Sequence, residues 1–175
     1  MGDFKKQGIN MLFKLKADYI LRHVTEIDLQ DLKSKGVKAL LFDLDNTIMA
    51  PRTGILTDDI QNWLKEVKKD FQIAVVSNNR KESYLEKASK TIGCPVYGKA
   101  EKPKRKIIYK ILDQMNLKPN EIAIIGDRPL TDIWVGKRLG TITILVDPLM
   151  KNKEPLVVKF LRKIERSFMY IHEEA

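Results

Sequence analysis

Two aspartates, Asp43 and Asp45, follow directly on an apolar run that ends at Phe42. In an extended chain, residues i and i+2 point to the same side, so this spacing predicts two neighbouring carboxylates. Carboxylates held that close repel each other, and one of them tends to keep its proton. A bound cation removes this cost by supplying the opposite charge. The stretch therefore predicts a metal site, which other residues of the chain must complete.

Polar residues with suitable chemistry recur after three further apolar runs. Hydroxyl and amide groups follow the second run, lysines follow the third, and carboxylates follow the fourth. In chain order, these candidates are Thr47 beside the first pair, Ser77, Asn78, Lys99, Lys102, Lys104, Asp127 and Asp132.

These residue types suit the transfer of a phosphoryl group. Asp43 could attack phosphorus and form an aspartyl-phosphate. Asp45 could protonate the leaving oxygen and later activate water. Mg²⁺, a hard cation that prefers oxygen ligands, fits such carboxylates best. Asp127 would supply the distant carboxylate ligand, and Asp132 would support it.

The remaining candidates suit a phosphate group. The Ser77 hydroxyl, the Asn78 amide and one lysine would hold phosphoryl oxygens, where charge must be stabilised. Thr47 is assigned to the same task. The residues alone leave open which of the three lysines takes part. Ser77 and Asp132 also suit helix capping, and the lysine-rich run 99–106 could be a solvated helix start.

The elements that would position these residues alternate between strand and helix. Apolar runs without polar alternation are typical of strands buried on both faces, and the intervening segments have helical periodicity. The alternation predicts an α/β fold with a doubly wound parallel sheet, in which sites lie at the carboxyl ends of the strands. The predicted strands are 37–42, 73–76, 96–97, 122–125 and 141–146, and the predicted helices are 57–69, 81–91, 103–115 and 130–139.

Two segments flank this core. Residues 3–35 are expected to hold one or two amphipathic helices, and residues 155–170 a basic amphipathic helix. The preferred interpretation of the latter is packing on the sheet, and the alternative is contact with a membrane surface. Without repeats or linkers, the chain is predicted to be a single domain, 1–175, with its motifs in 37–147.

Composition adds constraints on compartment and partners. The chain has 175 residues, a net charge of +9 and a single cysteine, Cys94. One cysteine excludes an internal disulfide and suits a reducing compartment. No signal-like segment is recognisable, so a cytoplasmic protein, peripheral to the membrane at most, is expected. The positive charge favours anionic partners: a phosphorylated small molecule, a phospholipid, a membrane surface or nucleic acid.

Four motifs carry a family resemblance. "DLDNT" (43–47), "VVSNN" (75–79), "KP" (102–103) and "GDRPLTD" (126–132) resemble, in order, the motifs of the haloacid dehalogenase (HAD) superfamily. This implies a Rossmann-like HAD core and phosphatase chemistry. Its implied site has Asp43 as nucleophile, Asp45 as acid/base, Asp43, the Asp45 carbonyl and Asp127 as metal ligands, and Ser77 and Lys102 as phosphate binders.

Spacing and the flanking sequence narrow the resemblance. Thr47 and Ser77 are separated by 29 residues, and Ser77 and Lys102 by 24, which leaves no room for a cap domain. The lead-in to Asp43 and the "KP" segment resemble the YqeG-type phosphatases of subfamily IIIA, which are similar to phosphatidylglycerophosphate phosphatases. Capless members have open sites that suit bulky phosphorylated substrates.

The leading prediction is therefore a Mg²⁺-dependent phosphomonoesterase. The alternative is a basic binding module, non-catalytic or dual-role, that docks on an anionic membrane or RNA. A receiver-type signalling domain is a third option, but it normally has its acidic pair and its phosphoacceptor on separate strands. The sequence leaves the physiological substrate and the oligomeric state open.

Overall fold

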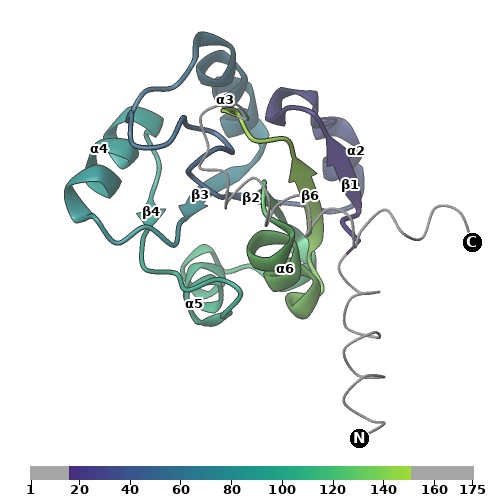
Figure 1. The fold of residues 1–175 in the computed structure, drawn as a ribbon. Helices are drawn as coiled ribbons and strands as arrows, with labels where there is room; N and C mark the ends of the chain where they lie inside the picture. Colours follow the sequence, from purple (N-terminus) through teal and green to yellow (C-terminus); the bar gives the residue numbers. More distant parts are fainter. Residues whose placement is uncertain (1–15, 151–175) are drawn as a thin grey trace, which may run out of the picture.

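The computed structural model describes residues 16–150, which form a parallel six-stranded sheet between two layers of helices (Figure 1). The strand order is β1-β6-β5-β2-β3-β4. The strands are β1 (Tyr19–Leu21), β2 (Ala39–Phe42), β3 (Gln72–Val76), β4 (Val96–Tyr97), β5 (Ile122–Gly126) and β6 (Ile142–Val146). The helices are α2 (Leu29–Ser34), α3 (Asp58–Asp70), α4 (Glu82–Ile92), α5 (Lys106–Met115) and α6 (Trp134–Leu139), with short helical turns η2 (Val24–Glu26), η3 (Pro119–Glu121) and η4 (Pro129–Ile133).

The central strand β2 is buried on both faces, as its sequence predicted. Leu40 and Phe42 pack in the core on one side of the sheet, whereas Ala39 and Leu41 pack in the core on the other side. All four side chains are at most 1% exposed. Apolar residues at every position are required here, because no face of the strand meets water.

Helices α2, α3 and α4 cover one face of the sheet, and α5 and α6 cover the other (Figure 1). β2 is followed by α3, whereas its neighbour β5 is followed by α6. The chains that leave β2 and β5 therefore diverge to opposite faces. Such a point of divergence opens a crevice at the carboxyl ends of the two strands.

The first described strand was not predicted. Tyr19–Leu21 falls in the segment expected to be helical, yet it pairs in parallel with Ile144–Val146 at the sheet edge. Three apolar residues carry no periodicity that separates strand from helix, and the pairing partner lies far along the chain. The expected helix in this segment is confirmed as α2, which Asp28 caps by accepting from two backbone N–H groups.

Two predicted helices begin differently in the structure. α5 begins at Lys106 rather than at Pro103, because a turn precedes it in which the Lys104 N–H donates to the Glu101 carbonyl at 2.9 Å. The predicted helix 130–139 is divided into η4, a wide π-type turn, and α6. Gly140 ends α6 in the left-handed conformation with φ of +73°, which glycine adopts without strain.

Other predictions fall on parts of the chain that the structure does not describe. The basic helix at 155–170 and the first part of 3–35 lie outside residues 16–150. Within residues 16–150, no helix has the length and apolar character needed to cross a membrane. The single-domain assignment for 1–175 stays a prediction.

Candidate active site

Asp43 lies where β2 leaves the sheet, at the crevice between β2 and β5. Its backbone N–H donates to the carbonyl oxygen of Ile125 at 2.8 Å, so the ladder between the strands fixes its position. Its side chain is 14% exposed, and its Oδ1 lies 2.6 Å from the Nζ of Lys102. The backbone of Asp43 is therefore held in place by the sheet, while its side chain stays partly accessible to solvent.

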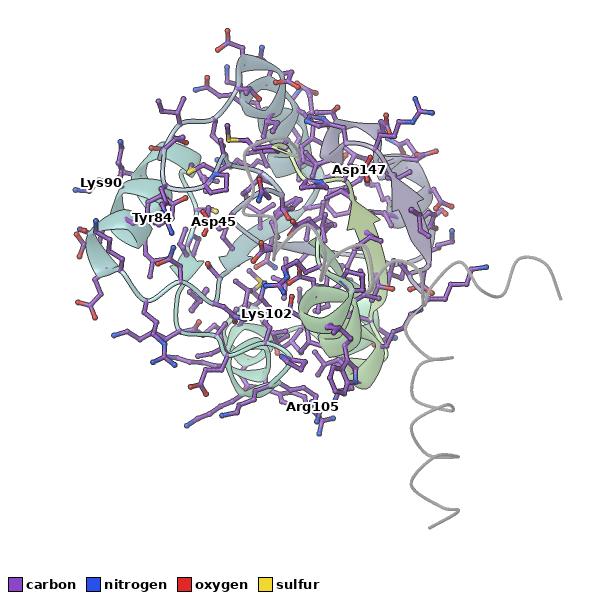
Figure 2. All side chains as sticks on the ribbon, viewed as in Figure 1. Asp45, Tyr84, Lys90, Lys102, Arg105 and Asp147 are labelled. Carbon is purple, nitrogen blue, oxygen red and sulfur yellow. The ribbon has the colours of Figure 1, made fainter. Side chains whose placement is uncertain are left out.

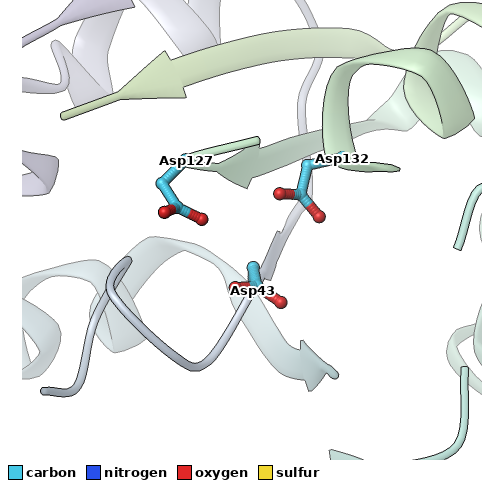
Figure 3. Close-up of side chains that lie close together, drawn as sticks. All are labelled: Asp43, Asp127 and Asp132. Atoms are coloured by element: carbon cyan, nitrogen blue, oxygen red, sulfur yellow. The ribbon is translucent and has the colours of Figure 1, made fainter. Parts of the chain in front are cut away.

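Three carboxylates meet at this edge of the sheet: Asp43, Asp127 and Asp132 (Figure 3). One oxygen from each lies within 4.8 Å of the others. Asp127 and Asp132 are each 1% exposed. Asp127 follows β5 directly and Asp132 lies in η4, so the crevice brings together residues far apart in the chain.

Lys102 supplies the opposite charge from beneath this cluster. Its Nζ lies 2.6 Å from Asp43 Oδ1 and 2.6 Å from Asp132 Oδ1, and its side chain is 3% exposed. The side chain of Asn78 holds the lysine backbone on both sides: Asn78 Oδ1 accepts from the Lys102 N–H at 2.7 Å, and Asn78 Nδ2 donates to its carbonyl at 3.2 Å. The ends of β3 and β4 are thereby joined to the acidic cluster.

The geometry separates the three candidate lysines. Lys99 pairs with Glu82 at 2.8 Å, and Lys104 pairs with Glu101 at 2.9 Å. Both lysine side chains are more than half exposed, and neither ion pair involves the acidic cluster. Of the three lysines, Lys102 is the one that contacts Asp43.

Burial shapes the acid–base properties of the central pair. Burial raises the pKa of Asp43 to about 7, with the nearby charge of Lys102 opposing the shift and the like charges of Asp132 and Asp127 adding to it. Burial alone would lower the pKa of Lys102, but Asp132 and Asp43 outweigh it and raise that pKa. Lys102 is therefore charged at neutral pH, whereas the metal-free Asp43 can hold a proton.

Asp45 lies apart from the acidic cluster, against α4 (Figure 2). Its Oδ1 accepts from the Tyr84 hydroxyl at 2.7 Å, and its Oδ2 accepts from Asn79 Nδ2 at 3.3 Å. The expectation that Asp43 and Asp45 would share one cluster was wrong at the level of side chains. Strand β2 ends at Phe42, and the chain bends at Leu44, between the two aspartates, so the i, i+2 rule for a strand no longer applies.

The predicted phosphate-binding residues lie at the same edge of the sheet. Ser77 is 2% exposed, and its hydroxyl accepts from the Asn79 N–H at 3.1 Å, as in a turn cap. Asn78 uses one amide hydrogen on Lys102, which leaves the second for a ligand. Thr47 is fully buried, and its hydroxyl has no hydrogen-bond partner within residues 16–150.

Asp132 has a supporting place in this arrangement. Its Oδ2 accepts from the Arg128 N–H at 3.1 Å, while its Oδ1 holds Lys102. A side chain on Gly126 would bring a Cβ within 2.3 Å of the Asp132 carboxyl carbon. Glycine is required at the end of β5 because the carboxylate of Asp132 lies directly against it.

The acidic cluster fits a divalent cation. When all three carboxylates are ionised, the single ammonium of Lys102 does not balance their charge. The donors are oxygen atoms only, which is the ligand type that Mg²⁺ prefers. Asp43 and Asp127 are the candidate ligands, because Asp132 uses one carboxylate oxygen on Lys102 and the other on the Arg128 N–H.

Comparison with known proteins decides the family. The family described as mitochondrial PGP phosphatase matches residues 14–150, most of the chain. The chain belongs to this family. It is 32% identical to the "Probable phosphatase YqeG" of Bacillus subtilis, over 87% of this chain and 88% of that protein. It is 30% identical to a phosphatidylglycerophosphate phosphatase 1 of Arabidopsis thaliana, over 86% of this chain and 47% of that longer protein.

This membership confirms a phosphatase of the HAD superfamily, a hydrolase of phosphoric monoesters. The fold agrees with a solved structure of an uncharacterized protein from Listeria monocytogenes serotype 4b. That structure superposes with a TM-score of 0.54 and 18% identity, over 68% of this chain and 85% of that chain. In this phosphatase, the four predicted motifs lie at or after the carboxyl ends of β2, β3, β4 and β5, in the order expected for the superfamily.

Two residues that the structure places at the site have no function assigned from the sequence. Tyr84 and Asn79 hold Asp45, yet Tyr84 lies in a helix rich in polar and charged residues. Its helical spacing with Leu85, Ala88 and Ile92 does predict an inward position. The periodicity does not show that the hydroxyl group reaches across to the loop after β2.

Proposed function

We propose that this phosphatase uses Mg²⁺ and forms an aspartyl-phosphate on Asp43. The observation that carries the proposal is the buried contact between Asp43 and Lys102 within a three-carboxylate cluster. An ammonium at 2.6 Å can hold a phosphoryl oxygen beside the attacking carboxylate. An ion pair at the surface is screened by water and does not require a buried lysine within a cluster of carboxylates.

The reaction has two steps. A carboxylate oxygen of Asp43 attacks phosphorus, the bond from phosphorus to the leaving oxygen breaks, and Asp45 gives that oxygen a proton. Water then attacks the phosphorus of the aspartyl-phosphate and gives a proton to Asp45, the bond from phosphorus to the Asp43 oxygen breaks, and inorganic phosphate leaves. Lys102, Ser77, Asn78 and Thr47 are assigned to the phosphoryl oxygens, whose charge must be stabilised.

Asp43, Asp127 and the backbone carbonyl of Asp45 would hold Mg²⁺, with Asp132 in support. The ion would neutralise the carboxylates and the phosphate, which otherwise repel each other. Without it, burial and like charges leave Asp43 with a raised pKa of about 7. The cation would thus keep the nucleophile ionised at neutral pH.

Phosphatidylglycerophosphate, or another bulky anionic phosphomonoester, is the proposed substrate. The support is the similarity to the phosphatidylglycerophosphate phosphatase 1 of Arabidopsis, together with the short connections at the site. α3 begins at Asp58 and α4 at Glu82, soon after the motifs that end β2 and β3. No cap domain is inserted in these connections, so a large leaving group can stay outside the crevice.

Phosphate release from p-nitrophenyl phosphate, with Mg²⁺ or with EDTA, tests this proposal. The Asp43→Asn variant should lose turnover by about 10⁴-fold, since it lacks the nucleophile. Wild-type turnover should disappear in EDTA and return with excess Mg²⁺. Turnover that persists in the Asp43→Asn variant and in EDTA would contradict the mechanism. Phosphatidylglycerophosphate in mixed micelles, compared with soluble alkyl phosphates, then tests the substrate.

A dual role, with peripheral contact to an anionic membrane, has a specific observation in its favour. Arg105 lies over the ring of Tyr109 at 5.8 Å, and Arg138 over the ring of Trp134 at 6.0 Å. The Arg105 guanidinium also donates to the Arg138 carbonyl at 3.2 Å, which joins the two pairs. Within residues 16–150, neither guanidinium forms an ion pair with a carboxylate. Tyr109 is exposed and Trp134 is half-buried. Cations beside aromatic rings that reach the surface are typical of surfaces that meet lipid head groups.

Vesicle sedimentation tests this contact in the full chain with EDTA present, so that catalysis plays no part. The double variant Lys106→Gln/Lys110→Gln beside these arginines should weaken binding to phosphatidylglycerol vesicles by about fivefold per charge. The control Lys65→Gln/Lys90→Gln removes equal charge from α3 and α4, on the opposite face of the sheet. Equal losses in both would contradict the proposed surface. Binding to RNA but not to vesicles would favour nucleic acid instead. A cytoplasmic location stays a prediction.

A further inference from the structure

One side of α4 holds the loop that follows the first motif. Tyr84, Lys87 and Thr91 are spaced by three and four residues, so they lie on the same side of the helix. Tyr84 reaches the first motif itself, and Lys87 and Thr91 reach the loop that follows it. The contacts are Tyr84 Oη to Asp45 Oδ1 at 2.7 Å, Lys87 Nζ to the Thr53 carbonyl at 3.1 Å, and Thr91 Oγ1 to the Gly54 carbonyl at 3.3 Å.

Tyr84 is the member of this row that reaches a reacting group. Its side chain packs in the core with Leu85 and Ala88, and the residue is 8% exposed. Burial raises the pKa of Tyr84, and the carboxylate of Asp45 raises it further. The hydroxyl therefore stays protonated and has one hydrogen to donate, which it gives to Asp45.

The contact fixes the orientation of the Asp45 carboxyl group. An aspartate side chain rotates broadly about its terminal bond when nothing holds it. Here Tyr84 holds Oδ1 and Asn79 holds Oδ2, at 2.7 and 3.3 Å. The shorter bond comes from a buried ring that cannot move without disturbing the core. Tyr84 is thus the stronger of the two constraints.

We propose that Tyr84 is a positioning residue, which orients Asp45 to protonate the leaving oxygen of the substrate. This inference rests on the acid/base role proposed above for Asp45. Protonation by a positioned side chain contributes about 10²- to 10⁴-fold, and a loosely held acid loses part of that contribution. The loss should depend on the leaving group. An alkoxide needs the proton as it leaves, whereas p-nitrophenolate is stable without it.

The test compares kcat/KM for glycerol phosphate and for p-nitrophenyl phosphate. kcat/KM reports on the steps through transfer of phosphorus to Asp43, even where hydrolysis of the intermediate limits kcat. Tyr84→Phe keeps the ring in the core and should lower kcat/KM for glycerol phosphate by about 10- to 100-fold. The value for p-nitrophenyl phosphate should fall by less than about threefold. Tyr84→Leu, which also lacks the hydroxyl, should show the same selectivity.

Two reference variants complete the design. Tyr97→Phe makes the same chemical change at a hydroxyl that contacts Gln114, away from Asp45, and should change neither value. Asp45→Asn should show the same selectivity as Tyr84→Phe with a larger loss. Adding Tyr84→Phe to Asp45→Asn should then cause little further loss, because both act through one proton transfer.

The outcomes separate the two proposals. If Asp45→Asn lowers kcat/KM equally for both substrates, the proposed role of Asp45 fails. If Asp45→Asn is selective but Tyr84→Phe is not, the role of Tyr84 is overturned while that of Asp45 stands. Equal losses for Tyr84→Phe on both substrates, with a lowered unfolding temperature, would make Tyr84 a structural residue only.

Discussion

The two halves of the active site are held in place by different forces. In the lysine half, Asp43 and Asp132 contact a buried ammonium, that of Lys102. In the tyrosine half, Asp45 is held by a neutral hydroxyl and a neutral amide. A charged contact fixes the proposed nucleophile, and neutral contacts fix the proposed acid/base. The difference suits the chemistry, since a fixed cation beside Asp45 would oppose its protonation.

Removing the ammonium of Lys102 should lower the free energy of unfolding more than any other single change in the lysine half. Lys102→Met leaves buried carboxylates without their cation, and losing one partner of a buried ion pair costs about 3–5 kcal/mol. Urea unfolding in EDTA measures the free energy. The control Lys99→Met removes an exposed pair with Glu82 and should cost less than about 1 kcal/mol. Similar losses in the free energy of unfolding for Lys102→Met and Lys99→Met would contradict the claim that burial makes the Lys102 contacts the stronger ones.

The lysine half should also depend on pH and on metal. The pKa of Asp43 in the metal-free fold, about 7, exceeds its ordinary value of 3.8. Between these values the folded state binds more protons than the unfolded state, so this group's contribution to stability falls as pH rises. A cation that binds the ionised carboxylate of Asp43 offsets this loss of stability. Mg²⁺ should therefore raise the unfolding temperature more at pH 8 than at pH 5.5.

Mg²⁺ at about 100 times its dissociation constant should add about 2.7 kcal/mol at the higher pH. Differential scanning fluorimetry with Mg²⁺ or EDTA measures the shift. Asp127→Asn is the matched variant, because it removes a proposed ligand without adding bulk. An equal Mg²⁺ effect at both pH values, or one that persists in Asp127→Asn, would place the ion elsewhere.

The smallest expected effect belongs to the second donor of the tyrosine half. Asn79→Ala removes the 3.3 Å bond to Asp45, and a neutral hydrogen bond of this kind contributes about 0.5–1.5 kcal/mol. kcat/KM for glycerol phosphate should fall by less than about tenfold, and by less than in Tyr84→Phe. Asn62→Ala, on the exposed side of α3, is the control. A larger effect for Asn79 than for Tyr84 would reverse the ranking of the two donors.

The sequence predicted the lysine half well because its residues stand at strand ends. Buried strands are recognisable from uninterrupted apolar runs, and parallel strands bring their carboxyl ends to one edge. This pattern alone predicts that Asp43, Ser77 and Asp127 lie at one edge of the sheet. Residue types alone leave the three lysines equivalent, whereas the family resemblance favours Lys102, which is the lysine that contacts Asp43.

The contacts of the tyrosine half and the strand at the sheet edge could not be predicted from the sequence, and the reason is the same for both. Tyr84 meets Asp45 across 39 residues, and Tyr19 meets Ile144 across the whole core. Periodicity predicts which face of a helix is buried, but not the atom that a side chain will touch. A three-residue strand has no period at all, so its assignment depends on a partner that only the folded chain provides.

The pairing of β1 with β6 also has a consequence for synthesis on the ribosome. The strand order places β6 between β5 and β1, so the earliest strand of the described chain has its sheet partner at residues 144–146. Chains emerge from the ribosome with the N-terminal part first. β1 therefore stays without its neighbour until nearly all of the core has been translated, and the nascent edge closes last although its residues are made first.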